Sequence, residues 1–158
     1  MNNSHIATAI AIRDLHCFTL ETLNDRILLQ KKVYLAQDIG LPLGYGYSWY
    51  IHGPYSPDLT NYIYDNLDML KDHDFSSYKL SDAAQNAVDT INNLECTKPE
   101  TLTTVSWYEL LASLLYIIRK WNAENPYEAL IKYKPKYTKA DYDAAMAQLQ
   151  GIGLAVAN

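Results

Sequence analysis

The chain has 158 residues, of which 49% are hydrophobic, and this size allows one core to bury most of the apolar surface. We therefore expect a single domain over residues 1–158 rather than two independent domains. The sequence contains 13 basic and 18 acidic residues, for a formal net charge of -5. This balance disfavours non-specific binding to a nucleic-acid backbone.

The cysteines and the apolar runs indicate an intracellular protein. Cys17 and Cys96 lie far apart and outside any CxxC spacing, which is typical of unpaired thiols in a reducing compartment. The longest apolar stretch, Leu110–Ile118, is too short to cross a bilayer, and no charged N-terminal segment leads into a long apolar run. We expect a soluble, cytoplasmic protein without a membrane partner.

The first third of the chain predicts helices followed by a strand. Helical patterns run from Ile6 to Leu15 and from Leu20 to Ile39. Thr22 and Asp25 match a capping box, which could divide the second segment into two helices near its start. From Tyr45 to Ile51 aromatic and aliphatic residues alternate with small and polar ones, which predicts a strand.

A helix is expected after the Gly53-Pro54 turn, at Ser56-Pro57-Asp58. Serine caps the first N–H groups, proline suits the first turn, and aspartate faces the positive end of the helix dipole. The helix should extend to Leu70, and Tyr78–Leu80 is the candidate partner strand for Tyr45–Ile51. The inward face of this helix is expected to contain Tyr62, Ile63, Leu67 and Leu70.

The second half of the chain predicts four further helices. Ser81 would cap the first, and Ser106-Trp107-Tyr108-Glu109 matches a capping box for the second, whose apolar run suggests the central helix. Asn125-Pro126 begins the third. Thr138 begins the fourth, and a frayed or loosely docked tail over Gly151–Asn158 follows.

One residue breaks the apolar pattern of the Leu20–Ile39 segment. At about 100° per residue, Lys32 falls near the middle of an apolar face and Lys31 at its edge. A lysine there must reach solvent, meet an internal carboxylate or lose its charge. A further hypothesis is that Lys32 lies in a groove and receives a carboxylate from a partner.

The sequence contains no recognisable motif for catalysis, metal binding or nucleotide binding. His16 and Cys17 are neighbours, and adjacent residues on a helix point in different directions. The acidic run Asp65–Asp74 lacks the glycine and the final glutamate of a calcium loop, and no phosphate-binding loop occurs. We predict no enzyme activity, metal or cofactor. The histidines share no metal-ligand spacing: His5, His16, His52 and His73.

Two aromatic clusters are candidate contact surfaces. Lysines and tyrosines near residue 135 could follow a phosphate backbone while bases stack on the rings, although such lysines are also typical of an ordinary surface. These lysines are Lys132, Lys134, Lys136 and Lys139, with Tyr133 and Tyr137 between them. Elsewhere, alternation and helical phase place three tyrosines away from the core, beside a Gly-Pro corner. This second cluster, a candidate protein-binding surface, comprises Trp49, Tyr50, His52, Tyr55 and Tyr64.

Four segments form a longer pattern: Leu29-Gln30-Lys31-Lys32-Val33-Tyr34-Leu35, Gly44-Tyr45, Trp49-Tyr50 and Gly53-Pro54-Tyr55-Ser56-Pro57-Asp58-Leu59. Trp107-Tyr108-Glu109-Leu110-Leu111-Ala112-Ser113 and Lys132-Tyr133-Lys134-Pro135 continue it. The pattern resembles the SocA-like, Panacea antitoxin-type domains, and more closely the YwgA-like bacterial proteins. The resemblance covers roughly residues 20–150, after an N-terminal helical extension over residues 1–19. Lys32 departs from it, since the family has an apolar residue there.

The resemblance implies a mainly helical domain with a small two- or three-stranded, winged-helix-like sheet. It also implies action through protein contacts, either neutralising a toxin in a toxin–antitoxin or phage-defence setting or adapting a target protein to a protease. It supplies no catalytic residues.

Two function classes follow. The leading interpretation is a non-catalytic, antitoxin-like module that binds a partner protein. The alternative is a winged-helix transcription regulator whose Ser56–Leu70 helix enters the major groove. DNA binding is disfavoured, because that helix has no Arg or Lys and contains Asp58, Asp65 and Asp68.

Overall fold

The computed structural model describes residues 3–17, 19–72 and 74–154. Within these ranges the chain forms eight α-helices, one short 3-10 helix and a two-stranded antiparallel sheet, which confirms a mainly α fold with a small sheet. The elements are α1 (Asn3–Asp14), α2 (Leu23–Asp38), β1 (Ser48–Tyr50), β2 (Gly53–Tyr55), α3 (Pro57–Asp65), α4 (Leu67–Asp72), α5 (Asp82–Asn93), η1 (Leu94–Thr97), α6 (Thr104–Arg119), α7 (Pro126–Tyr133) and α8 (Lys139–Gly151).

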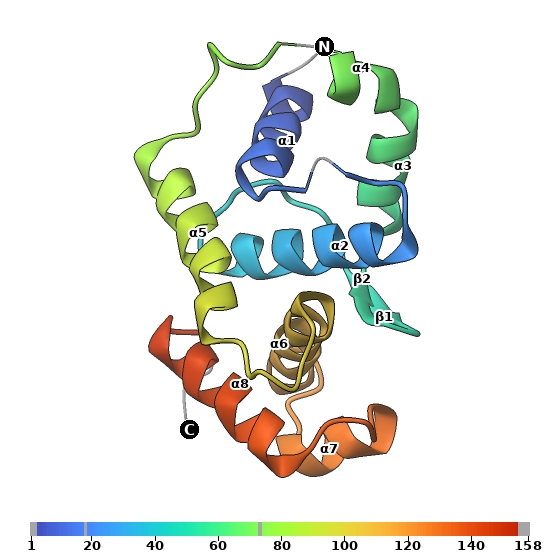
Figure 1. The fold of residues 1–158 in the computed structure, drawn as a ribbon, viewed down its shortest axis with the longest axis vertical. Helices are drawn as coiled ribbons and strands as arrows, with labels where there is room; N and C mark the ends of the chain where they lie inside the picture. Colours follow the sequence, from blue (N-terminus) through green and yellow to red (C-terminus); the bar gives the residue numbers. More distant parts are fainter. Residues whose placement is uncertain (1–2, 18, 73, 155–158) are drawn as a thin grey trace.

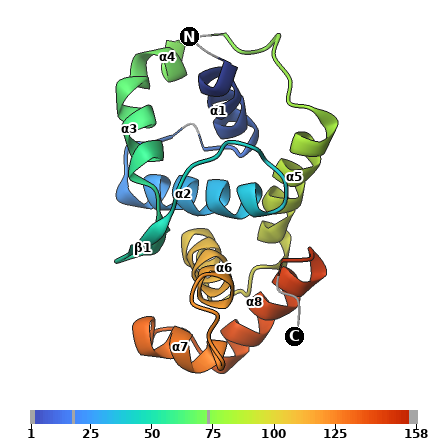
Figure 2. The same cartoon turned by 180° about the vertical axis from the view of Figure 1, so that it is seen from behind.

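The helices are arranged in layers around α2 and α6 (Figure 1). α2 crosses the middle of the molecule, with α1, α3 and α4 on one side of it and α6 on the other. α7 and α8 lie beyond α6, and α2 packs most extensively against α6. The view from behind shows the β1–β2 hairpin at the level between α2 and α6, at the opposite edge of the molecule from α5 (Figure 2).

α6 is the central helix, as its apolar sequence predicts. Every residue from Trp107 to Ile117 is buried, and the apolar ones belong to a hydrophobic cluster that extends from Ala9 in α1 to Leu154 after α8. The polar atoms of Trp107 and Tyr108 find partners inside the core. Trp107 Nε1 donates to the Leu94 carbonyl at 2.8 Å, and the Tyr108 hydroxyl donates to the Ile91 carbonyl at 2.6 Å.

Several helices begin at the predicted caps. The side chains of Ser56, Ser81, Asn125 and Thr138 each accept a hydrogen bond from the backbone N–H three residues later. Thr22 and Asp25 form the predicted capping box, but this box begins α2. The suggested division of Leu20–Ile39 into two helices is therefore wrong.

Two other helix predictions need correction. The start of α6 is capped by Thr103, whose hydroxyl accepts from the Ser106 N–H at 3.1 Å, so Ser106 and Glu109 form no capping box. The predicted Ser56–Leu70 helix is interrupted at Asn66, whose side-chain amide donates to the Tyr62 carbonyl at 2.7 Å. Its inward face is otherwise as expected, with Tyr62, Ile63 and Leu70 buried and Leu67 partly buried.

The small sheet differs from the sequence prediction. Only Ser48–Tyr50 of the predicted Tyr45–Ile51 strand is extended in the sheet, and its partner is Gly53–Tyr55. Tyr78–Leu80 forms no strand. Ser48–Tyr50 pairs with Gly53–Tyr55 rather than with Tyr78–Leu80 because closing a two-residue loop costs less chain entropy than closing a long one.

The described part of the C-terminal tail is docked. Leu154 is 3% exposed, and its carbonyl accepts from Arg119 Nη2 at 3.0 Å. Of the two predicted states of the tail, frayed or loosely docked, residues 152–154 are docked. Residues 155–158 lie outside the described ranges.

The hairpin turn places a positive-φ glycine against α6. Gly53 has a φ of +92°, and a Cβ built on it would collide with Ser113 Oγ. Ser113 is fully buried, and its hydroxyl has no hydrogen-bond partner among the described residues. Only glycine fits here without strain.

We expect Gly53→Ala to lower the free energy of unfolding by roughly 2–4 kcal/mol, through both backbone strain and the clash. Adding Ser113→Ala should recover part of this loss, because it removes the colliding oxygen but leaves the φ strain. Ser113→Ala alone should be neutral or stabilising, because it removes an unsatisfied buried hydroxyl. Urea unfolding of the four proteins checks this, and additive effects of the two substitutions would contradict it.

Candidate functional site

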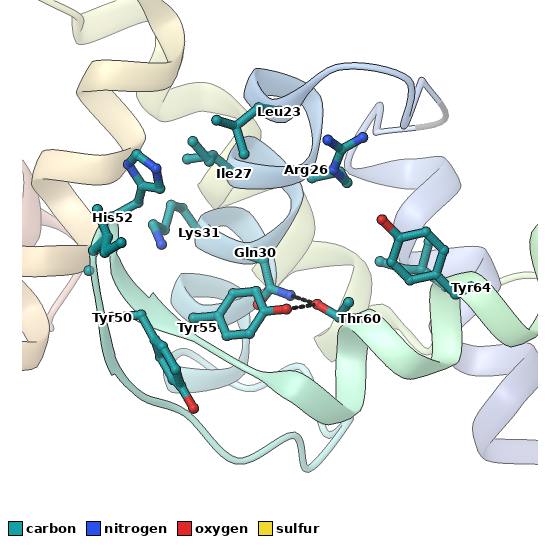
Figure 3. Close-up of a pocket in the computed structure, with 13 residues that line it drawn as sticks. Leu23, Arg26, Ile27, Gln30, Lys31, Tyr50, His52, Tyr55, Thr60 and Tyr64 are labelled. Carbon is teal, nitrogen blue, oxygen red and sulfur yellow. Dashed lines mark hydrogen bonds between the residues drawn. The ribbon is translucent and has the colours of Figure 1, made fainter.

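Gln30 joins α2 to the start of α3. Its amide nitrogen donates to the Ser56 carbonyl at 3.1 Å, and its amide oxygen accepts from the Ser56 N–H at 2.9 Å. The same nitrogen donates to the Thr60 hydroxyl at 2.9 Å, which donates to the Tyr55 hydroxyl at 2.6 Å (Figure 3). This network fixes the corner between β2 and α3.

Two buried lysines hold the hairpin. Lys31 of α2 donates to the Pro54 carbonyl at 2.6 Å, and Lys134, just after α7, donates to the Ile51 carbonyl at 2.7 Å. Lys134 is also 2.9 Å from the buried carboxylate of Glu109 in α6, and Lys136 lies 3.8 Å from the same oxygen. The turn and the second strand are therefore each tied to a different helical layer by an ammonium group.

The two lysines differ in how their charge is compensated. Lys134 has a carboxylate in contact, whereas no salt bridge to Lys31 occurs among the described residues. Lys31 is 1% exposed, and burial lowers the pKa of its ammonium from 10.5 to about 7. The charge of Glu109 partly opposes this lowering of the pKa, and that of Lys134 adds to it.

A pocket of ≈ 290 Å³ opens between the N-terminal half of α2, the hairpin and α3 (Figure 3). We call it the hairpin groove. Its apolar walls are Leu23, Ile27, Tyr50, Ile51, Ile63 and Tyr64.

Large apolar side chains surround the opening of the hairpin groove. Ile51 is 87% exposed, Tyr64 57%, Leu23 55% and Tyr50 48%. These four are more than half of the large hydrophobic side chains that are exposed among the described residues. Such a concentration around one pocket is typical of a binding surface.

The hairpin groove brings together four of the residues predicted from sequence to bind a partner. Tyr50, His52, Tyr55 and Tyr64 all line it. The Gly53 turn brings the hairpin residues to the groove, and the Ser56 cap starts the helix that brings Tyr64. That they bind a partner remains a prediction.

Trp49 lies outside this set. Strand alternation points it to the other face of the hairpin, where its ring centroid is 4.5 Å from that of Trp121 and 5.6 Å from that of Tyr116. The ammonium of Lys134 lies 5.8 Å from the Trp49 ring centroid. Trp49 therefore supports the hairpin from behind and does not line the groove.

The predicted position of Lys32 in a groove is wrong. Lys32 is 4% exposed and donates to the Leu15 carbonyl at 2.9 Å and to Asn92 Oδ1 at 3.3 Å. Its ammonium also lies 5.1 Å from the centre of the Tyr108 ring. Helical phase correctly placed Lys32 on the inward face, but the chain after α1 and a side chain of α5 supply its acceptors.

The lysines near residue 135 do not form a set of free cations. Lys134 is buried against Glu109, Lys136 lies near the same carboxylate, and Lys139 pairs with Asp143 at 3.0 Å. Tyr137 is buried, whereas Lys132 is exposed beside the Tyr133 ring. The structure therefore removes most of the support for nucleic-acid contact at this cluster.

The structure also disfavours the alternative in which the Ser56–Leu70 segment enters the major groove of DNA. Asp58 and Asp65 of α3 are exposed, and Asp68, now in α4, is exposed as well. A DNA phosphate backbone approaching this face would meet negative charge.

No three metal-ligand side chains come close enough together in residues 3–17, 19–72 and 74–154 to hold a metal ion. His73 lies outside these ranges. Across the same residues, none of the helices combines the length and apolar character required to span a bilayer.

Sequence reasoning missed the anchoring residues Gln30, Lys31 and Glu109. Gln30 and Lys31 stood in the quoted pattern, but their acceptors lie more than twenty positions away along the chain. Glu109 is an acidic residue within the apolar α6, which could have indicated a buried ion pair. Its spacing from Ser106 instead suggested a capping box.

A scan against protein-family models gives no match for this chain. Searches among curated proteins and among solved structures give none either.

The lowered pKa of Lys31 predicts how stability depends on pH. Between about 7 and 10.5 the unfolded chain keeps a proton on this lysine that the native protein has released. Relative to Lys31→Met, the free energy of unfolding of the wild type should therefore rise with pH from 7 to about 9.5, by at most about 1.4 kcal/mol per unit.

Urea unfolding of both proteins across this range measures the difference. Contributions from the tyrosines and Cys17 are common to the two proteins and cancel. A difference that stays constant with pH would contradict the prediction, since Lys31 would then keep its charge in the native state.

Proposed function

We propose that this protein is a non-catalytic interaction module that acts by binding a partner protein at the hairpin groove. One observation carries the proposal: four exposed, large apolar side chains surround a pocket that is already formed. Partner binding would remove their apolar surface from water.

The anchoring of the groove supports this proposal. Lys31 and Lys134 bond to hairpin carbonyls and Gln30 bonds to Ser56 at its end, so Tyr50 and Ile51 are presented on a fixed backbone. A fixed surface loses little conformational entropy on binding. Tyrosine and other large side chains around a small pocket are also the usual composition of an interface hot spot.

The buried polar groups beside the groove support a non-catalytic role. The ammonium groups of Lys31 and Lys134 bond to hairpin carbonyls, and the carboxylate of Glu109 contacts Lys134. Because Ser113 is fully buried beneath Gly53, its unpaired hydroxyl is not exposed to a substrate. These groups have structural roles.

The sequence resemblance suggests the class of partner. We propose that the protein is antitoxin-like or phage-defence-associated and holds a toxin or another defence component. In this role it needs only to occupy a surface of its partner, for which a preformed groove is sufficient.

Groove variants test the binding site. The partner is first isolated with the wild-type protein from the source organism and then purified. Tyr64→Ala and Ile51→Ser should each weaken this complex by about tenfold or more, because they remove apolar contact area at the groove.

Tyr78→Ala is the matched control, since Tyr78 is 39% exposed and lies outside the groove. It should leave the affinity unchanged. Calorimetric binding measurements, with thermal unfolding to verify folding, give the comparison. Equal affinities for wild type and both groove variants would rule out this site.

Co-expression tests the antitoxin-like role. If the partner is a toxin, its expression alone arrests growth; the wild-type protein should then restore growth, and Tyr64→Ala should do so less well at equal abundance. A partner that causes no growth defect would contradict a toxin-neutralising role and leave the binding site itself untouched.

A further inference from the structure

The charge of the hairpin groove is opposite to that of the whole protein. The chain has a formal net charge of -5, yet the lining residues include Arg26 and Lys31 and no aspartate or glutamate. His52 also lines the groove. The apolar walls of such a pocket strengthen the electric field of its cationic groups, and this field attracts an anion.

Arg26 retains hydrogen-bonding capacity at the groove. Its Nη1 donates to the Leu20 and Glu21 carbonyls at 3.1 and 3.2 Å, which holds the side chain against the start of α2. Among the described residues, no hydrogen bond or ion pair uses its Nε or Nη2. A guanidinium with unused N–H donors is the usual partner of a carboxylate.

Lys31 is a second basic residue of the groove and lies deeper in it than Arg26. Its ammonium makes a single hydrogen bond, to Pro54, among the described residues, although it has three donors. Glu109, whose charge acts on Lys31, already contacts Lys134 and Lys136. Lys31 therefore adds positive charge to the groove while it is protonated, and above its pKa of about 7 the positive charge of the groove resides on Arg26.

We propose that the groove binds a short segment of the partner that inserts a large apolar side chain between Tyr50 and Tyr64 and places a carboxylate against Arg26. This inference rests on the proposed function and names the chemistry of the partner. Figure 3 shows Arg26 on the Tyr64 side of the apolar floor formed by Ile27, so one segment can reach both features.

The volume of the groove sets the size of the inserted group. A pocket of ≈ 290 Å³ lies at the lower end of the range for small-ligand sites. It suits one or two side chains of a segment that continues over the exposed rim. The carboxylate is that of an aspartate, a glutamate or a chain end.

A displayed library of random peptides of about 12 residues tests this proposal. The library is selected on the full-length wild-type protein and depleted on Tyr64→Ala. Enriched peptides should combine a large apolar residue with an acidic residue or a free C-terminus at a constant spacing. Their affinities are then measured by fluorescence polarisation.

A double-mutant cycle locates the carboxylate. Neutralising the acid of a selected peptide should weaken binding to wild type by about tenfold and have little effect on binding to Arg26→Gln. Arg26→Lys, which keeps the charge and is less disruptive to α2, should retain part of the preference. Lys132→Gln, which removes an exposed charge outside the groove, should retain all of it.

Three results of the peptide experiments would overturn the proposal. The enriched peptides could be neutral or basic, they could show equal acid dependence on Arg26→Gln, or no peptide could distinguish wild type from Tyr64→Ala. Self-association of the wild type that Tyr64→Ala abolishes would also overturn it, since a second copy would then be the occupant. The native complex tests the proposed function separately, because Tyr64→Ala can weaken that complex whatever the peptide charge.

Discussion

Two buried ammonium groups determine where the hairpin lies. Lys31 and Lys134 reach it from different helical layers and bond to the carbonyls of Pro54 and Ile51. Removing an ammonium from water is costly unless acceptors replace the lost hydration. The hairpin carbonyls and Glu109 are these acceptors, so the core and the hairpin stabilise each other. Moving the hairpin away would leave the buried Lys31 without its acceptor and Lys134 with Glu109 alone.

This arrangement explains how a two-stranded sheet can present a binding surface. An isolated hairpin of this size is marginally stable in water. Here Gly53 packs against Ser113, Trp49 stacks behind the strands, and the polar anchors fix the turn. Tyr50 and Ile51 can then remain exposed without the backbone collapsing onto the core. The contacts that make the hairpin rigid therefore also allow its apolar side chains to stay exposed.

Local interactions could be predicted from the sequence, and long-range ones could not. The caps at Ser56 and Thr138 depend on atoms three residues apart, so the chain itself identifies both partners. The pairing of Lys134 with Glu109 depends on how α6 and α7 pack, and a local capping motif for Glu109 appeared equally good. For Lys32, helical phase identified a buried face but not the acceptor at Leu15.

The structure also separates the residues that build the groove from those that would select its occupant. Gln30 and Lys31, in the first segment of the quoted sequence pattern, bond to Ser56 and Pro54, in a later segment of it. Lys32, which departs from the pattern, bonds on the far side of α2 and leaves this junction intact. The pattern therefore has a structural explanation in the junction itself. Selectivity would instead reside in groove residues outside the pattern, among them the exposed Leu23, Ile51 and Tyr64 and the basic Arg26.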